Sequence, residues 1–194
     1  MEARAQRIVE TAIELAEKGG FEAVRLRDVA ADAGVALGTL YRRFRSKEDL
    51  LIAALEMETA LLERRVLDRI PRGEGSLERV TQFFGVATRG MCRRPNLARA
   101  CIRAAAYGDP ELAQRVASFQ HRIESLVLVA LRGAPVDAGA APVSEEDRRV
   151  ASTLQLVWFA SLVGWSGGLH GQAAVVEQTR NAAELMLAPR PWQN

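Results

Sequence analysis

The stretch LRDVAADAGVALGTLYRRFRSKED, residues 26–49, decides the fold of this 194-residue chain. Its apolar residues recur at helical spacing and Gly34 interrupts the pattern, which predicts two short helices joined by a tight turn. Each helix has one apolar face, so the two are expected to pack against each other as a helix-turn-helix. These faces carry Val29 and Ala33 in the first helix and Leu40 and Phe44 in the second.

The side of the second helix opposite its apolar face carries hydroxyl and guanidinium groups. Between residues 25 and 47 six arginines and lysines stand against two aspartates, whereas the formal net charge of the whole chain is only +2. A helix-turn-helix places its second helix in the major groove, and this concentrated charge predicts DNA binding. Arg42 suits either a guanine base or a phosphate. The expected contacts from this helix and the start of the next are Gly38, Thr39, Tyr41, Arg42, Arg43 and Lys47.

Helical periodicity continues through the rest of the chain, and runs of β-branched residues are scarce. A glycine pair at 19–20 ends the first helix, and Ser46 with Asp49 resembles a capping box. The sequence therefore predicts an all-α fold, with a three-helix helix-turn-helix domain (1–47) joined to a C-terminal helical bundle (48–194). Beyond the first three helices, further helices are expected at about 46–70, 77–91, 96–107, 110–131, 144–164 and 172–187.

A longer segment carries a family resemblance. Residues 19–55, GGFEAVRLRDVAADAGVALGTLYRRFRSKEDLLIAAL, resemble the DNA-binding domain of TetR-family transcriptional repressors. The resemblance implies that Thr39, Tyr41 and Lys47 contact the DNA backbone, with Arg27 as a further contact. The positions that match the family pattern are Gly38, Thr39, Leu40, Tyr41, Phe44, Ser46, Lys47 and Leu50.

Two positions depart from that family pattern. Arg25 stands where the family commonly has a threonine that caps the following helix and touches a phosphate. An arginine cannot cap the helix, but it can reach the phosphate. Ala36 stands where a serine or threonine commonly caps the next helix, so we expect that helix to fray at its start.

The resemblance also implies what the larger C-terminal part does. TetR-like proteins use it to form a homodimer and to hold a small effector whose binding releases the operator DNA. The long helix that begins near Lys47 is the expected lever between the two roles. The expected dimer surface is formed by the last two helices, about 144–187. Apolar residues such as Leu154, Trp158 and Leu162 either pair across the dimer or close the core of the monomer.

The C-terminal part is similar to the cholesterol-catabolism branch of the same family, which implies a small hydrophobic effector of the steroid or acyl-CoA type. Arg99 and Arg103, four residues apart, can meet the phosphates of such a ligand or form ion pairs. Aromatic residues and methionines supply the candidate effector contacts, although the same residues are typical of an ordinary core. These candidates are Met57, Phe83, Phe84, Met91, Tyr107, Phe119 and Trp158.

Other classes of function find little support in the sequence. His121 and His170 are isolated, and no nucleophile, base and orienting group can be assembled, so neither an enzyme nor a metal or cofactor site is expected. Cys92 and Cys101 are expected to be buried thiols, with a redox sensor as the alternative. No apolar stretch is long enough to span a membrane, so a cytoplasmic protein is expected. The rival interpretation is a constitutive dimeric DNA-binding protein with no effector pocket.

Overall fold

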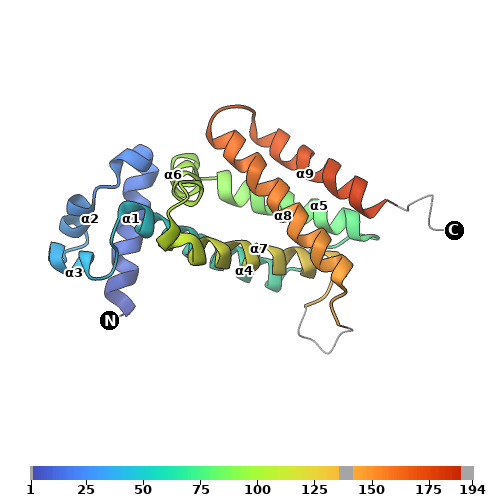
Figure 1. Cartoon of the computed structure of the whole chain (residues 1–194), viewed down its shortest axis with the longest axis horizontal. Coiled ribbons are helices and arrows are strands. Elements are labelled where there is room, and N and C mark those ends of the chain that lie inside the picture. Colours follow the sequence, from blue (N-terminus) through green and yellow to red (C-terminus); the bar gives the residue numbers. More distant parts are fainter. Residues whose placement is uncertain (1, 136–141, 189–194) are drawn as a thin grey trace. The chain divides into compact units, whose positions relative to one another are not determined.

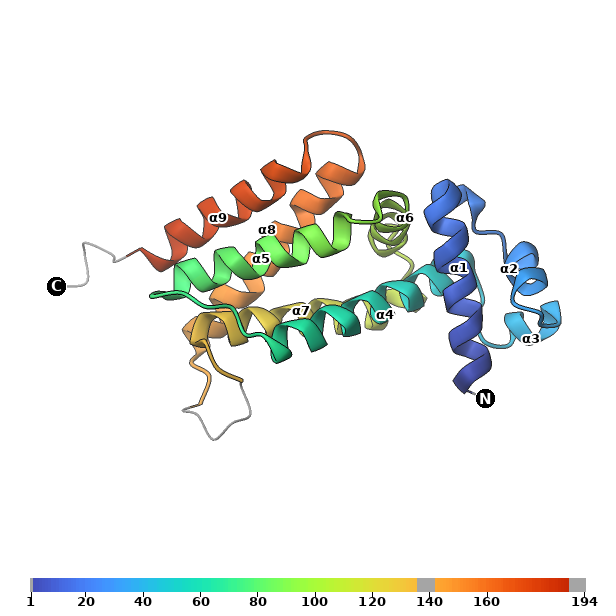
Figure 2. The ribbon, with the colours of Figure 1, turned by 180° about the vertical axis from the view of Figure 1, so that it is seen from behind.

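The computed structural model describes residues 2–135 and 142–188, and this part of the chain is helical without strands (Figures 1 and 2). The all-α prediction is therefore confirmed. Its helices are α1 (Glu2–Ala23), α2 (Leu26–Asp32), α3 (Leu37–Tyr41), α4 (Lys47–Asp68), α5 (Ser76–Cys92), α6 (Pro95–Ala106), the 3-10 turn η1 (Pro110–Leu112), α7 (Ala113–Arg132), α8 (Glu145–Ser166) and α9 (Gln172–Leu187).

The helix boundaries agree with the sequence patterns except at three places. The helical ribbon of α1 continues to Ala23, but the glycine pair breaks its geometry, with φ values of −141° at Gly19 and 68° at Gly20. α3 ends at Tyr41 rather than near Phe44, and the chain turns before α4. The segment expected as one helix from residue 110 opens with a 3-10 turn, which the Asp109 side chain caps by accepting a hydrogen bond from the Glu111 amide at 2.9 Å.

The chain divides into two compact units. The first contains residues up to Ala60 together with Met91–Phe119, and the second contains the described parts of Leu61–Gly90 and Gln120–Asn194. α4 and α7 each contribute residues to both units. These units are defined by contacts between residues and do not test where DNA binding ends and regulation begins. The expected division of these two roles at residue 47 therefore stays a prediction.

In the first unit α1 packs against α2 and α6, and α2 packs against α3. Small residues on α1 and α6, such as Ala12 and Ala100, have no exposed surface, so the two helices approach closely. Leu40 of α3 and Leu50 of α4 are also fully buried. Removing these apolar side chains from water is the main stabilising contribution to this unit.

In the second unit a large aromatic cluster joins α5 and α8. The rings of Phe83 and Phe84 meet edge to face at 5.0 Å between centroids, and Phe84 lies 5.9 Å from Trp158. The Trp158 indole donates a hydrogen bond to the Thr88 hydroxyl at 2.9 Å, so its one polar group is satisfied inside the core.

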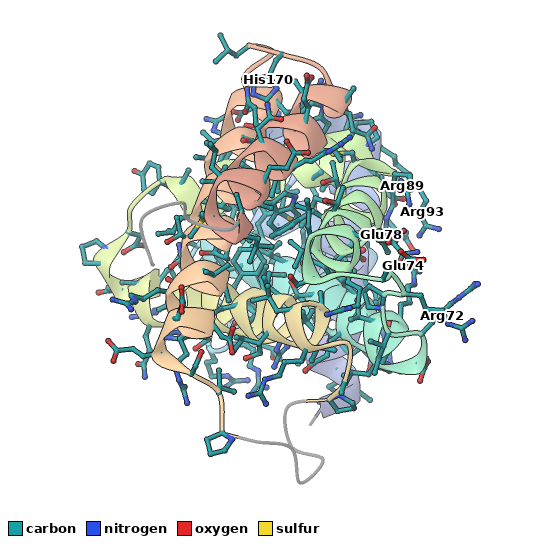
Figure 3. The ribbon with its side chains drawn as sticks, turned by 90° about the vertical axis from the view of Figure 1, so that its right-hand side faces the viewer. Arg72, Glu74, Glu78, Arg89, Arg93 and His170 are labelled. Carbon is teal, nitrogen blue, oxygen red and sulfur yellow. The ribbon has the colours of Figure 1, made fainter. Side chains whose placement is uncertain are left out.

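Gly164, near the end of α8, lies against a side chain from the turn between α8 and α9. A Cβ atom added to Gly164 would lie 2.7 Å from Nε2 of His170, which is labelled in Figure 3. A side chain at position 164 would therefore require the His170 ring to move from its place against α8. This contact gives His170 a structural role.

Gly34 and Gly38 offer a matched test of the turn that precedes the proposed recognition helix. Gly34 has φ +65°, whereas Gly38 lies in α3 without a positive φ, and an added Cβ would meet nothing within 4 Å at either position. We expect Gly34→Ala to lower the free energy of unfolding by about 1 kcal/mol, because an alanine is strained in this conformation.

The control, Gly38→Ala, is expected to leave the stability unchanged or to raise it by up to about 1 kcal/mol, because alanine favours the helix. Urea denaturation followed by circular dichroism measures both. Equal effects of the two substitutions would contradict the role assigned to Gly34.

Candidate functional site

The expected DNA-contacting residues all lie in the first unit, where six of the eight are exposed and two are half-buried. We call these eight residues together the α2–α3 surface. Tyr41 is 48% exposed although it belongs to a large aromatic type that is usually buried. The surface consists of the exposed Arg25, Arg27, Gly38, Tyr41, Arg42 and Arg43 and the half-buried Thr39 and Lys47.

Buried residues beneath this surface set its orientation. Leu40 is fully buried and Phe44 is 6% exposed, while Val29 of α2 has no exposed surface. Since Leu40 and Tyr41 are neighbours on one helix, anchoring Leu40 inward turns the tyrosine outward. The Arg42 guanidinium donates a hydrogen bond to the Thr39 hydroxyl at 3.1 Å, which links the two groups expected to meet DNA.

The two departures from usual helix capping also appear in the structure. Neither Arg25 before α2 nor Ala36 before α3 provides a side-chain hydrogen bond to its helix. The expectation that both helices begin without a side-chain cap is therefore confirmed. Packing, rather than capping, holds these short helices in place.

Lys47 lies in a cluster that the sequence did not reveal. Its ammonium group is 3.4 Å from the Glu22 carboxylate and 3.9 Å from the centre of the Phe21 ring. Arg103 of α6 contacts the same ring at 3.9 Å and the same carboxylate at 2.9 Å. Hydrogen bonds from Lys47 and Arg103 lower the pKa of Glu22. Of the two roles considered for Arg103, the ion pair is therefore the one observed.

The start of α4 is held by a second network. The Asp49 amide donates to the Ser46 hydroxyl at 3.1 Å, as the capping-box pattern indicated, and the Arg45 amide donates to the Asp49 carboxylate at 3.0 Å. Arg115 of α7 pairs with Asp49 and forms a bidentate bond with Glu56 at 2.8 and 2.6 Å. The hydrogen bonds that Arg115 donates to Glu56 raise the pKa of Arg115. Sequence spacing offered no signal for Arg115, because its partners are about 60 residues away along the chain.

The candidate effector contacts do not form one group. Tyr107 is 70% exposed and therefore does not line an enclosed cavity in this conformation. Phe83, Phe84 and Trp158 pack together in the second unit, as described above. Met57, Met91, Tyr107 and Phe119 belong to the first unit, where Phe119 is buried and the two methionines are half-buried.

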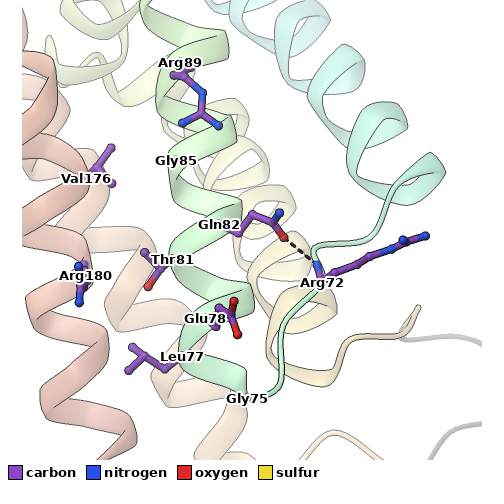
Figure 4. A pocket seen from close by; sticks show the side chains of 10 residues that line it. All are labelled: Arg72, Gly75, Leu77, Glu78, Thr81, Gln82, Gly85, Arg89, Val176 and Arg180. Carbon is purple, nitrogen blue, oxygen red and sulfur yellow. Dashed lines mark hydrogen bonds between the residues drawn. The ribbon is translucent and has the colours of Figure 1, made fainter.

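A groove of about 690 Å³ lies between α5 and α9 in the second unit (Figure 4). The segment before α5 is held against α5 by the Arg72 backbone amide, which donates a hydrogen bond to the Gln82 side chain at 2.7 Å. Within the described chain the guanidinium groups of Arg72 and Arg89 have no acidic partner, whereas Arg180 pairs with Glu184. The groove is lined by Arg72, Gly75, Leu77, Glu78, Thr81, Gln82, Gly85, Arg89, Val176 and Arg180.

The two cysteines are buried thiols, as the sequence indicated. Desolvation by burial raises the pKa of Cys92 to about 11 and that of Cys101 to about 12. Both thiols therefore stay protonated and unreactive near neutral pH.

Within residues 2–135 and 142–188, no three His, Cys, Asp or Glu side chains are grouped to hold a metal ion. Across the same ranges no helix combines the length and apolarity needed to cross a membrane.

Comparison with known families gives two matches that together cover more than half of the chain. Residues 8–54 match the bacterial regulatory proteins of the tetR family, and residues 73–186 match the tetracyclin repressor-like C-terminal domain. The α2–α3 surface lies within the first matched range.

Individual relatives agree with these matches. The chain is 34% identical to the HTH-type transcriptional repressor KstR of Rhodococcus jostii over 184 residues, which cover 95% of this chain and 82% of that repressor. It is similar to a crystal structure of a TetR transcriptional regulator from Rhodococcus sp. RHA1, with a TM-score of 0.81, 29% identity and 97% of each chain covered. Thermus thermophilus FadR in complex with lauroyl-CoA has the same fold, with a TM-score of 0.74, 21% identity and 98% of each chain covered.

Removing side chains from the α2–α3 surface is expected to weaken DNA binding. We expect Arg42→Ala to weaken binding to double-stranded DNA by about tenfold or more, because a guanidinium contact to a base or phosphate is lost, and Tyr41→Ala with Arg42→Ala to weaken it further. Electrophoretic mobility shift measures the affinity, with DNA selected by the wild-type protein from a random pool.

The control is Arg64→Ala, which removes the same charge from an exposed position outside this surface. It is expected to leave the affinity almost unchanged. Unchanged binding by the Tyr41 and Arg42 double variant would remove both residues from the DNA contact.

Proposed function

Because this chain belongs to the TetR family of bacterial regulatory proteins and is a DNA-binding transcriptional repressor rather than an enzyme, we propose that it binds operator DNA as a homodimer and is released by a small hydrophobic effector. Operator binding would place it in the bacterial cytoplasm. The observation that carries the proposal is the outward setting of Tyr41 and Arg42 above the buried Leu40.

In the proposed DNA complex, some residues of the α2–α3 surface contact bases and others contact phosphates. Thr39 lies on α3 and Arg42 is the residue at its C-terminal cap, and both are suited to base edges in the major groove. Arg25, Arg27 and Lys47 flank that helix and are suited to phosphates, which position the protein on the duplex. The Lys47 ammonium group is partly exposed, and we propose that a phosphate competes with the Glu22 carboxylate, 3.4 Å away, for it.

The proposed dimer surface is the outer face of α8 with the adjoining face of α9. Leu154, Trp158 and Leu162 have no exposed surface, so these residues close the core of their own chain. Another apolar stripe on α8 faces outward, with Leu156 53% and Val163 37% exposed. Leu185 of α9 is 82% exposed. Such a face is self-complementary between two copies related by a twofold axis, and it supports pairing as a four-helix bundle.

The proposed effector is an amphiphile of the acyl-CoA type, with a steroid acyl group as a special case. One structurally similar protein, Thermus thermophilus FadR, is known in complex with lauroyl-CoA. In this chain the α5–α9 groove combines apolar walls, from residues such as Leu77 and Val176, with three arginines. That combination suits a ligand with an apolar part and an anionic part. We therefore propose that the arginines bind the anionic part of the effector.

Release from DNA requires that the effector favour one arrangement of the dimer. Two recognition helices must lie about 34–36 Å apart, one helical turn, to enter successive major grooves on the same face of the duplex. A ligand that binds a differently spaced arrangement more tightly shifts the population away from the DNA-binding one.

The effector proposal predicts that lauroyl-CoA weakens DNA binding. We expect a loss of affinity of at least about tenfold at a saturating concentration of lauroyl-CoA, a typical coupling between two binding sites. Fluorescence anisotropy of labelled operator DNA measures this effect. Free CoA and lauric acid, each lacking half of the amphiphile, serve as controls. An operator affinity that none of a panel of acyl-CoA and steroid ligands changes would favour the constitutive DNA-binding protein.

The dimer proposal predicts that charge on the outer face of α8 separates the two copies. We expect Leu156→Asp combined with Val163→Asp to yield a folded monomer that binds DNA at least about tenfold more weakly, because avidity between two half-sites is lost. Analytical ultracentrifugation measures the assembly state. The control, Leu169→Asp, changes a residue that is 81% exposed in the turn after α8 and should stay dimeric. A dimeric double variant would rule out this face.

A further inference from the structure

One carboxylate of the first unit is shared by two cations. Glu22 lies near the end of α1, and its Oε1 accepts a hydrogen bond from Arg103 of α6 at 2.9 Å. Its Oε2 accepts from the ammonium group of Lys47, the first residue of α4, at 3.4 Å. Both cationic groups also lie 3.9 Å from the centre of the Phe21 ring. Glu22 therefore joins the proposed phosphate contact to an arginine of a helix outside the helix-turn-helix.

The charges of this cluster do not balance. Lys47 and Arg103 bring two positive charges and Glu22 brings one negative charge, so the three side chains together carry one excess positive charge. The hydrogen bonds from Lys47 and Arg103 lower the pKa of Glu22, which is therefore ionised at neutral pH. A phosphate of DNA is the anion that gives each cation a partner of its own.

Of the two cations, Lys47 is the one that is released more easily. Its distance from Glu22, 3.4 Å, exceeds the roughly 2.7–2.9 Å typical of a charge-assisted hydrogen bond, whereas the Arg103 contact is 2.9 Å. Glu22 and Arg103 are also exposed, so water and salt weaken the pairing. An exchange of partners at Glu22 therefore has a small cost in free energy.

We propose that Glu22 holds Lys47 in the DNA-free protein and pairs with Arg103 alone once a DNA phosphate binds Lys47, so that this exchange sets the affinity for DNA. Glu22 is then an internal competitor of the phosphate. Arg103 is a positioning residue that acts through Glu22 without touching DNA. The proposal rests on the proposed function, since it requires Lys47 to contact a phosphate.

Replacing Glu22 by glutamine removes the competing charge and keeps the shape of the side chain. We expect Glu22→Gln to bind DNA about threefold to tenfold more tightly at about 0.1 M salt, because an exposed pair contributes up to about fivefold per copy and two copies bind. The gain is expected to fall as the salt concentration rises and screens the pair. Fluorescence anisotropy measures the affinity, with labelled DNA selected by the wild-type protein from a random pool.

The matched control is Glu14→Gln. Glu14 is an exposed glutamate of the same helix, about two helical turns from Glu22, so the substitution removes the same charge at a distance from Lys47. It is expected to leave the affinity within about twofold of the wild type. Equal gains from the two variants overturn the proposal, because they would reflect net charge alone.

A double-mutant cycle with Lys47 tests the mechanism. Lys47→Gln alone is expected to weaken DNA binding by about threefold or more, because each copy loses a phosphate contact. In that background we expect Glu22→Gln to change the affinity by less than about 1.5-fold, because no ammonium group is left for which to compete. A gain that persists without Lys47 contradicts the exchange.

Arg103→Gln tests the other half of the exchange. We expect this variant to bind DNA about threefold more weakly, because Glu22 then pairs with Lys47 alone. The same substitution is expected to have almost no effect in the Glu22→Gln background. A loss that remains there would show that Arg103 meets DNA directly, and would overturn its role through Glu22.

The outcomes separate this inference from the proposed function. If Lys47→Gln binds DNA as tightly as the wild type, the phosphate contact at Lys47 is wrong and the exchange is wrong with it. If Lys47→Gln weakens binding while Glu22→Gln behaves like Glu14→Gln, the phosphate contact stands and only the exchange is overturned. A gain in Glu22→Gln that requires Lys47 supports the exchange, and such a gain cannot arise from a loss of folded protein.

Discussion

The burial of Leu40 and Phe44 is the contact on which the proposed DNA-binding surface depends. α3 spans only Leu37–Tyr41, which is too short to be stable by itself, and it begins without a side-chain cap. Its conformation is therefore set by packing against α2. Because Leu40 has no exposed surface, the helix cannot rotate without bringing an apolar group into water. That constraint turns Tyr41 and Arg42 outward.

The beginning of α4 is held by charged groups from distant parts of the same unit. Arg115 reaches the Asp49 cap and the Glu56 carboxylate, and Lys47 shares Phe21 and Glu22 with Arg103. Most of these side chains are partly exposed, so each ion pair contributes little to stability. Their effect is to fix the start of α4 after α3, and with it the position of Lys47, which we propose as a phosphate contact.

The second unit combines an apolar core with a few polar exceptions. The aromatic rings of α5 and α8 fill the interior, and the Trp158 indole is paired with the Thr88 hydroxyl. Among the described residues, the Gln155 side-chain nitrogen is a buried donor without a partner. The outer stripe of α8, with Leu156 and Val163, is exposed for a different reason. Within the described residues it is left partly exposed, and it is the face that the proposed dimer would cover.

The sequence by itself determined the all-α fold, the helix-turn-helix, the family and the outward position of the residues expected to contact DNA. Helical periodicity and capping residues are local signals, and a recognition helix anchored at Leu40 must expose Tyr41 and Arg42. Only the tertiary structure decided that Arg115 reaches Asp49, that Lys47 and Arg103 share Phe21, and that Leu156 rather than Leu154 is free on α8. These contacts join residues far apart in the chain, and packing between helices, which no single segment encodes, selects the face that each helix buries.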